Sequence, residues 1–174
     1  MNKIIAFVIL GLTTITYANI NAVVSILPQK TFLKKIGGDK VNISVMVKQG
    51  SSPHSYEPKP SQMRNINNAD IYFSIGIDFE DTWLNKFKDL NTDMIVKDMG
   101  NEIEKISIVQ HSHHKNKQSK NENHNHAHTG YKKDPHIWLS PINVKIIATN
   151  IYKELSQIDK KNKSYYKINL ENFL

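Results

Sequence analysis

The sequence predicts an α/β fold in which four short strands form a mostly parallel sheet flanked by helices. Four apolar runs rich in β-branched residues recur along the chain, at 23–27, 41–47, 71–76 and 94–99. Amphipathic or polar segments of helical length separate them, as in consecutive strand–helix units. The 174 residues suffice for one domain with its own core.

The first 18 residues match a secretory signal peptide. Lys3 precedes an apolar run over residues 4–12, and small or polar residues follow as far as Ala18. This run is too short to span a bilayer, so a retained membrane anchor is the weaker interpretation. We expect cleavage after Ala18, with Ala22 as the second choice, and export of the remaining chain.

Three helices are expected between the strands, and each has a recognisable apolar face. The first ends at the glycine pair 37–38, the second starts near Ser61, and the third covers residues 80–90. Their apolar positions are Phe32, Leu33 and Ile36; Met63 and Ile66; and Trp83, Leu84 and Phe87.

Residues 110–133 have a different composition, rich in His, Asn, Lys and Ser, and they cannot bury a core. We interpret this segment as a disordered loop. Beyond it, Ser140 and Pro141 have the residue types of an N-cap and a first helical position, and an apolar stripe continues to Ile158. Residues 162–174 show mixed helical spacing without a stop signal.

The net charge of +7 is not spread evenly along the chain. Residues 19–109 contain equal numbers of basic and acidic side chains, and the excess lies in the polar loop and the tail. Such basicity is typical of solvated segments, so we expect no nucleic-acid partner. Cysteine is absent, which predicts a soluble periplasmic protein without disulfides, thiolate ligands or a covalent lipid anchor.

The histidines are the most informative residues, because a metal site without cysteine needs imidazole and carboxylate ligands. His54 follows the apolar run 41–47, and ligands of open α/β sheets bind at the carboxyl ends of strands. His54 is therefore the first candidate ligand. The alternative is a surface histidine in a turn.

His136 is the second candidate ligand. Pro135 restricts the backbone of Asp134, and the apolar residues after His136 fix the chain against a core. Asp134 or Glu57 could orient a ligand histidine through a hydrogen bond. For Asp134, a residue that only shapes a turn is the slightly favoured interpretation. Six further histidines in the polar loop could bind metal only weakly, since ordering a flexible segment costs free energy; they are His111, His113, His114, His124, His126 and His128.

Three segments, 53–61, 68–76 and 134–141, resemble the zinc and manganese receptor family of ABC transporters. The motifs His-x-Tyr-Glu-Pro and Asp-Pro-His-x-Trp within them are specific to it. The resemblance implies two α/β lobes joined by a long helix, with one metal ion between them. It also implies that His54 and His136 are ligands and that two more come from a C-terminal lobe. Residues 19–160 would form the N-terminal lobe and 161–174 the start of the interlobe helix, with the C-terminal lobe missing.

The resemblance further implies a function in transport. We expect a monomeric periplasmic receptor, not an enzyme, that captures Zn²⁺ and delivers it to a membrane ABC permease. The histidine-rich insertion is similar to that of zinc members of the family. The alternatives are a manganese receptor of the same family, a metal-dependent adhesin, and a zinc metallohydrolase in which Glu57 acts as the base.

Overall fold

All four predicted apolar runs contribute strands to one parallel sheet in the computed structural model, which describes residues 19–108 and 132–174. The strands are β1 (Ile20–Val24), β2 (Val41–Val45), β3 (Ile71–Ser74) and β4 (Ile95–Asp98). Their order is β2-β1-β3-β4, and all three neighbouring pairs are parallel. The predicted sheet is confirmed. The expected signal peptide and the six histidines of the polar loop lie outside the described residues.

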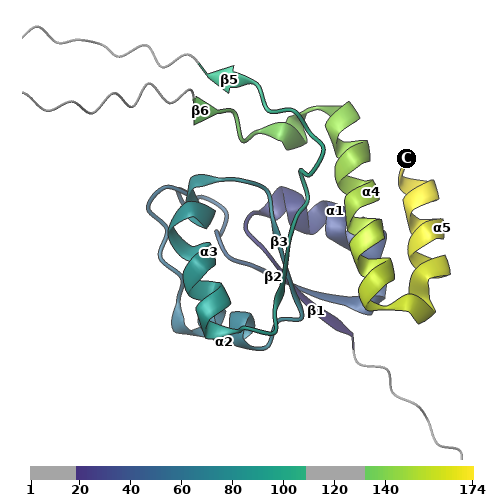
Figure 1. Ribbon diagram of the computed structural model, residues 1–174, viewed down its shortest axis with the longest axis horizontal. Helices are drawn as coiled ribbons and strands as arrows, with labels where there is room; N and C mark the ends of the chain where they lie inside the picture. The colour runs from purple at the N-terminus through teal and green to yellow at the C-terminus, as the bar shows by residue number, and fades with distance from the viewer. Residues whose placement is uncertain (1–18, 109–131) are drawn as a thin grey trace, which may run out of the picture.

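Within the described residues, five α-helices cover both faces of the sheet. They are α1 (Leu27–Gly37), α2 (Pro60–Asn67), α3 (Asp78–Leu90), α4 (Pro141–Ile158) and α5 (Lys163–Phe173). Figure 1 shows α1, α4 and α5 on one side of the sheet and α2 and α3 on the other. Because both faces are covered, the central strand β3 is buried along its whole length.

The first strand differs from the prediction, which placed it at 23–27. β1 ends at Val24, and Leu27 already belongs to α1. Pro28 lies in the first turn of α1, where a missing N–H is tolerated. The buried Gln29 accepts hydrogen bonds from the backbone N–H groups of Ser25 and Ile26, at 2.9 and 3.0 Å. The apolar run therefore divides between a strand and a helix.

The short strands β5 (Ser107–Ile108) and β6 (Lys132–Lys133) form an antiparallel pair. They flank the part of the chain that the structure leaves undescribed. The last two residues of the predicted 110–133 loop thus belong to β6. Strands of two residues are too short to give a periodic signal in the sequence.

The C-terminal helices α4 and α5 pack against α1 and against each other, and α4 also reaches β4 through the Lys97–Glu154 ion pair. α4 begins at Pro141 with Ser140 at the N-cap, as predicted, although the Ser140 side chain makes no capping hydrogen bond. Tyr166 and Leu170 of α5 are buried, and the Asn169 amide donates to the carbonyl of Ile36 in α1 at 2.9 Å. No helix within residues 19–108 and 132–174 is long and apolar enough to cross a membrane.

Candidate metal site at the carboxyl edge of the sheet

His54 lies in the loop that connects β2 to α2, and its side chain is 72% exposed. Its Nδ1 atom lies 2.5 Å from Oδ2 of Asp78, the first residue of α3. This contact joins the loop after β2 to the end of the turn after β3. The fold thus brings a carboxylate onto His54 from a distant part of the sequence.

The loop that holds His54 is attached to the body of the lobe through Tyr56. The Tyr56 hydroxyl donates to Gln62 Oε1 at 2.8 Å, and the Gln62 amide donates to the carbonyl of Val45 at 3.1 Å. The Tyr56 ring packs against Phe79, with the ring centroids 6.0 Å apart. Since Phe79 is the neighbour of Asp78, this packing holds the loop next to the carboxylate that contacts His54.

The turn that precedes Asp78 is held in place by hydrogen bonds to the buried side chain of Glu80. Glu80 is only 5% exposed, and its carboxylate accepts hydrogen bonds from the backbone N–H of Ile75 at 3.0 Å and of Gly76 at 2.7 Å. The hydroxyl of Ser25 also donates to it. Burial raises the pKa of Glu80, while the hydrogen bonds from Ser25 and the turn oppose that rise. Gly76 has a φ of +78°, a conformation that glycine adopts without strain.

His136 forms the second histidine–aspartate pair. Its Nδ1 lies 2.7 Å from Asp134 Oδ1, which also accepts the backbone N–H of His136 at 2.9 Å. These two hydrogen bonds lower the pKa of Asp134. The next residue, Ile137, is buried against Gly100, close to the end of β4; a Cβ on Gly100 would lie 2.5 Å from Ile137 Cδ1. His136 is therefore presented by a rigidly packed segment.

An open hollow of about 530 Å³ lies beside His136 and reaches toward the end of β3. Its lining includes Asp134, His136, Glu104 and Lys105. The Lys105 ammonium donates to the carbonyl of Ile75, directly after β3, at 3.0 Å. His54 and Asp78 follow the carboxyl ends of β2 and β3, and Ile137 packs on Gly100 just after β4, so both histidine–aspartate pairs lie at the carboxyl edge of the parallel sheet.

His54 and His136 are held by the same kind of contact. An aspartate contacts Nδ1 in each case, which leaves Nε2 as the nitrogen available to a metal ion. Within the described residues, no group of three or more His, Cys, Asp or Glu side chains could hold a metal ion. Each pair thus leaves one imidazole nitrogen, Nε2, that its aspartate does not occupy.

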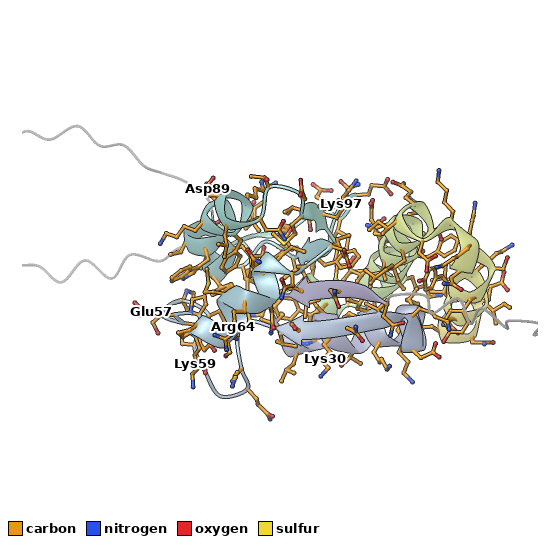
Figure 2. The ribbon with its side chains drawn as sticks, turned by 90° about the horizontal axis from the view of Figure 1, so that it is seen from below. Lys30, Glu57, Lys59, Arg64, Asp89 and Lys97 are labelled. Atoms are coloured by element: carbon orange, nitrogen blue, oxygen red, sulfur yellow. The ribbon has the colours of Figure 1, made fainter. Side chains whose placement is uncertain are left out.

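The structure places the two predicted orienting carboxylates differently. Asp134 contacts His136, as the sequence suggested. Glu57 is exposed and lies at the periphery of the molecule (Figure 2), and in the described part of the chain it forms no ion pair with either histidine. The carboxylate on His54 is that of Asp78, which sequence reasoning missed. Asp78 could have been identified in the sequence from its position shortly after the third apolar run, at the carboxyl end of a predicted strand.

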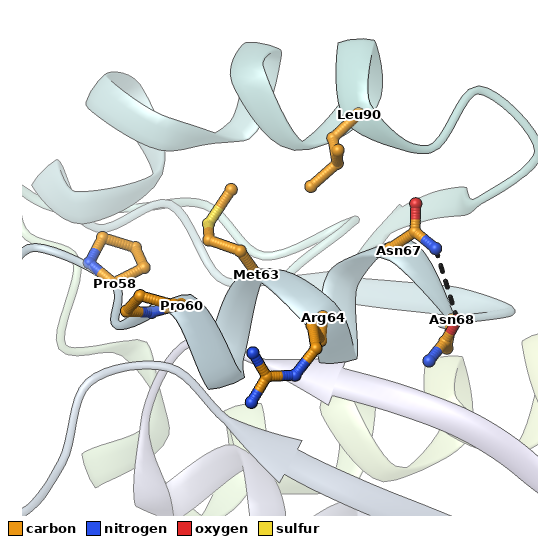
Figure 3. A pocket seen from close by; sticks show the side chains of 7 residues that line it. All are labelled: Pro58, Pro60, Met63, Arg64, Asn67, Asn68 and Leu90. Carbon is orange, nitrogen blue, oxygen red and sulfur yellow. Dashed lines mark hydrogen bonds between the residues drawn. The ribbon is translucent and has the colours of Figure 1, made fainter.

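A second hollow, of about 600 Å³, lies between α2 and α3. Figure 3 shows Met63 of α2 and Leu90 of α3 pointing toward one another across it. Its lining contains Arg64 and two asparagines but no imidazole or carboxylate. Because a metal site in this protein needs such ligands, this groove is not a candidate metal site.

The comparison with protein families decides the classification. The family model of the zinc-uptake complex component A periplasmic, ZnuA, matches residues 22–174. The chain belongs to the ZnuA family. Its fold agrees: a crystal structure of ZnuA is 39% identical, has a TM-score of 0.74, and is matched over 90% of this chain and 53% of its own length. The prediction of an N-terminal lobe of this family is confirmed.

Two curated relatives have names that specify metals in general or manganese. The metal ABC transporter substrate-binding lipoprotein SloC of Streptococcus mutans is 34% identical over 79% of this chain and 42% of its own length. The manganese lipoprotein PsaA of Streptococcus pneumoniae is 32% identical over 80% of this chain and 42% of its own length. The chain thus spans about half the length of these relatives. Their names include lipoprotein, whereas this sequence has no cysteine.

Proposed function

We propose that this chain is the metal-capturing N-terminal lobe of a periplasmic receptor that binds Zn²⁺ and delivers it to a membrane ABC permease. The observation that supports this most directly is the pair of histidines at one sheet edge, each with Nδ1 on an aspartate. His54 and His136 would bind the ion through Nε2, and the remaining ligands would come from a C-terminal lobe. The process is binding and release without chemical turnover.

Zinc is the proposed cargo because of the ligand chemistry. Imidazole nitrogen suits zinc, whereas manganese prefers carboxylate and other oxygen ligands. We expect calorimetric titration of the chain to give an affinity for Zn²⁺ at least about tenfold above that for Mn²⁺, in line with the general order of divalent-metal affinities. An equal or higher affinity for Mn²⁺ would instead support the manganese receptor, the function that the name of PsaA gives.

The histidine-rich segment is proposed as an auxiliary, low-affinity binder. Its six imidazoles lie outside the described residues, so the proposal depends on their number and spacing in the sequence alone. Several imidazoles close in sequence can share an ion, but ordering a long segment around it costs about 1–2 kcal/mol per residue. The segment would therefore raise the local zinc concentration near the lobe rather than replace the site at the sheet edge.

Zinc affinity should fall in acid, because each imidazole must lose its proton before it can bind a metal ion. With two histidine ligands, we expect the dissociation constant to rise by up to about 100-fold between roughly pH 7.5 and 5.5, about tenfold for each protonated imidazole. Titrations in a series of non-chelating buffers would measure this change. A site made of carboxylates would show a much smaller change over this range, and that result would contradict the histidine assignment.

A further inference from the structure

We propose that Asp78 is the positioning residue that determines which nitrogen of His54 faces the metal. The carboxylate lies 2.5 Å from Nδ1, and a neutral imidazole can make this contact only when the proton is on Nδ1. Nε2 then bears the lone pair and faces away from Asp78. The benefit for metal capture depends on the function proposed above, whereas the choice of tautomer does not.

In the described part of the chain, the Asp78 contact is what orients the His54 ring. The imidazole is 72% exposed, and Asp78 is its only hydrogen-bond or ion-pair partner among residues 19–108 and 132–174. An exposed ring without such a partner would rotate and exchange tautomers freely. A carboxylate on Nδ1 fixes the ring orientation and raises the basicity of the opposite nitrogen, as it does for histidine ligands of metals generally.

Asp78 can do this because its own position is fixed. Its side chain is 25% exposed, and it is the first residue of a helix whose preceding turn is held by the buried Glu80. Packing of Tyr56 on Phe79 brings the His54 loop to the same place. The orientation of His54 is therefore set by tertiary structure, across two separate strand–helix connections.

His136 offers an internal comparison. Its partner Asp134 is only two residues away, and the same aspartate oxygen accepts the backbone N–H of His136. That pair is a local turn and does not involve α3. A change at Asp78 should therefore alter the imidazole of His54 and leave that of His136 unchanged.

The first test is the tautomer of His54 in the metal-free protein, measured by ¹H–¹⁵N NMR of the imidazole rings at about pH 8, where imidazole is neutral. We expect His54 of the unaltered chain to be protonated on Nδ1. In Asp78→Ala the Nε2-protonated form that a free histidine side chain prefers should become the major one. Asp78→Asn should retain the Nδ1 form, because its amide oxygen can accept the same hydrogen bond.

Asp81→Ala is the matched control. Asp81 is an exposed carboxylate in the same first turn of α3, so its removal makes the same change in charge at the same helix terminus. We expect the ring signals of His54 in this variant to match those of the unaltered chain. If Asp78→Ala also leaves them unchanged while circular dichroism shows a folded protein, the positioning role of Asp78 is refuted.

The second test is zinc titration of the same variants. Loss of an orienting partner commonly costs 10- to 100-fold in metal affinity, so we expect that loss in Asp78→Ala, less in Asp78→Asn and none in Asp81→Ala. A shifted tautomer with unchanged zinc affinity would overturn the role in metal capture. If the unaltered chain itself bound no zinc, the proposed function would fail, while the NMR result would still decide the tautomer.

Discussion

Replacing both His54 and His136 by alanine is expected to eliminate the high-affinity component of zinc binding, raising the dissociation constant by about 100-fold or more. Even the loss of a group that only orients a ligand costs 10- to 100-fold, and here the ligand nitrogens themselves are removed. Isothermal titration calorimetry would measure the effect. Each single variant should lie between the unaltered chain and the double variant, because one imidazole remains at the sheet edge.

The control for this experiment is the histidine-rich segment. A variant with all six of its histidines changed to asparagine should lose weak, multiple binding and retain the high-affinity component. The six positions are His111, His113, His114, His124, His126 and His128. If this variant lost the high-affinity component and the His54–His136 double variant retained it, the metal site would lie in the segment and the assignment at the sheet edge would be wrong.

Glu80→Ala is expected to lower the free energy of unfolding by about 3 kcal/mol, which corresponds to a drop of roughly 6–12 °C in Tm for a chain of this size. The carboxylate accepts the backbone N–H groups of Ile75 and Gly76 in a buried turn. Without it these donors lose their partners, at about 1–3 kcal/mol each. Thermal and urea unfolding followed by circular dichroism would measure the loss.

Two further variants show whether the loss comes from these hydrogen bonds. Asp81→Ala removes an exposed carboxylate from the same helical turn and should change stability by less than about 0.5 kcal/mol. Glu80→Gln keeps one acceptor oxygen and should cost less than Glu80→Ala. Equal stability of Glu80→Ala and the unaltered chain would show that the turn after β3 does not need the carboxylate.

The pH dependence of stability offers an independent check on Glu80. Burial raises the pKa of Glu80 in the folded chain above its value in the unfolded chain. Between the two values the folded state binds more protons, so its stability should decrease as pH rises from the ordinary carboxyl range through the raised pKa. Glu80→Gln has no titrating group there and should lack this part of the dependence.

Most of the fold could be predicted from the sequence because the strands are apolar runs bounded by helical segments. The boundary of β1 could not, since the apolar run continues from Val24 into α1 and only the packing separates the two. The strand pair β5–β6 was also missed. Two residues per strand leave no periodicity to recognise.

The candidate site was predictable where its contacts are local. Asp134 could be named as the partner of His136 because the two residues lie in one turn. His54 lies close in sequence to Glu57, but the carboxylate that contacts it belongs to Asp78, beyond an intervening helix and strand. Only the crossover from β2 to β3 makes these residues neighbours. A single sequence contains no direct signal of that kind.

The buried Glu80 also has a consequence for where a metal ion would bind in the proposed receptor. β1 and β3 are neighbours, and the chain leaves them toward opposite edges of the sheet, which is the topological switch point of an open α/β fold. Such folds usually admit a ligand into the crevice at that point. Here the Glu80 carboxylate accepts hydrogen bonds from Ser25 after β1 and from Ile75 after β3. The Glu80 side chain therefore fills the crevice between the ends of these two strands. If the proposed function holds, a metal ion would therefore bind on the outer loops that bear His54 and His136 rather than in this crevice.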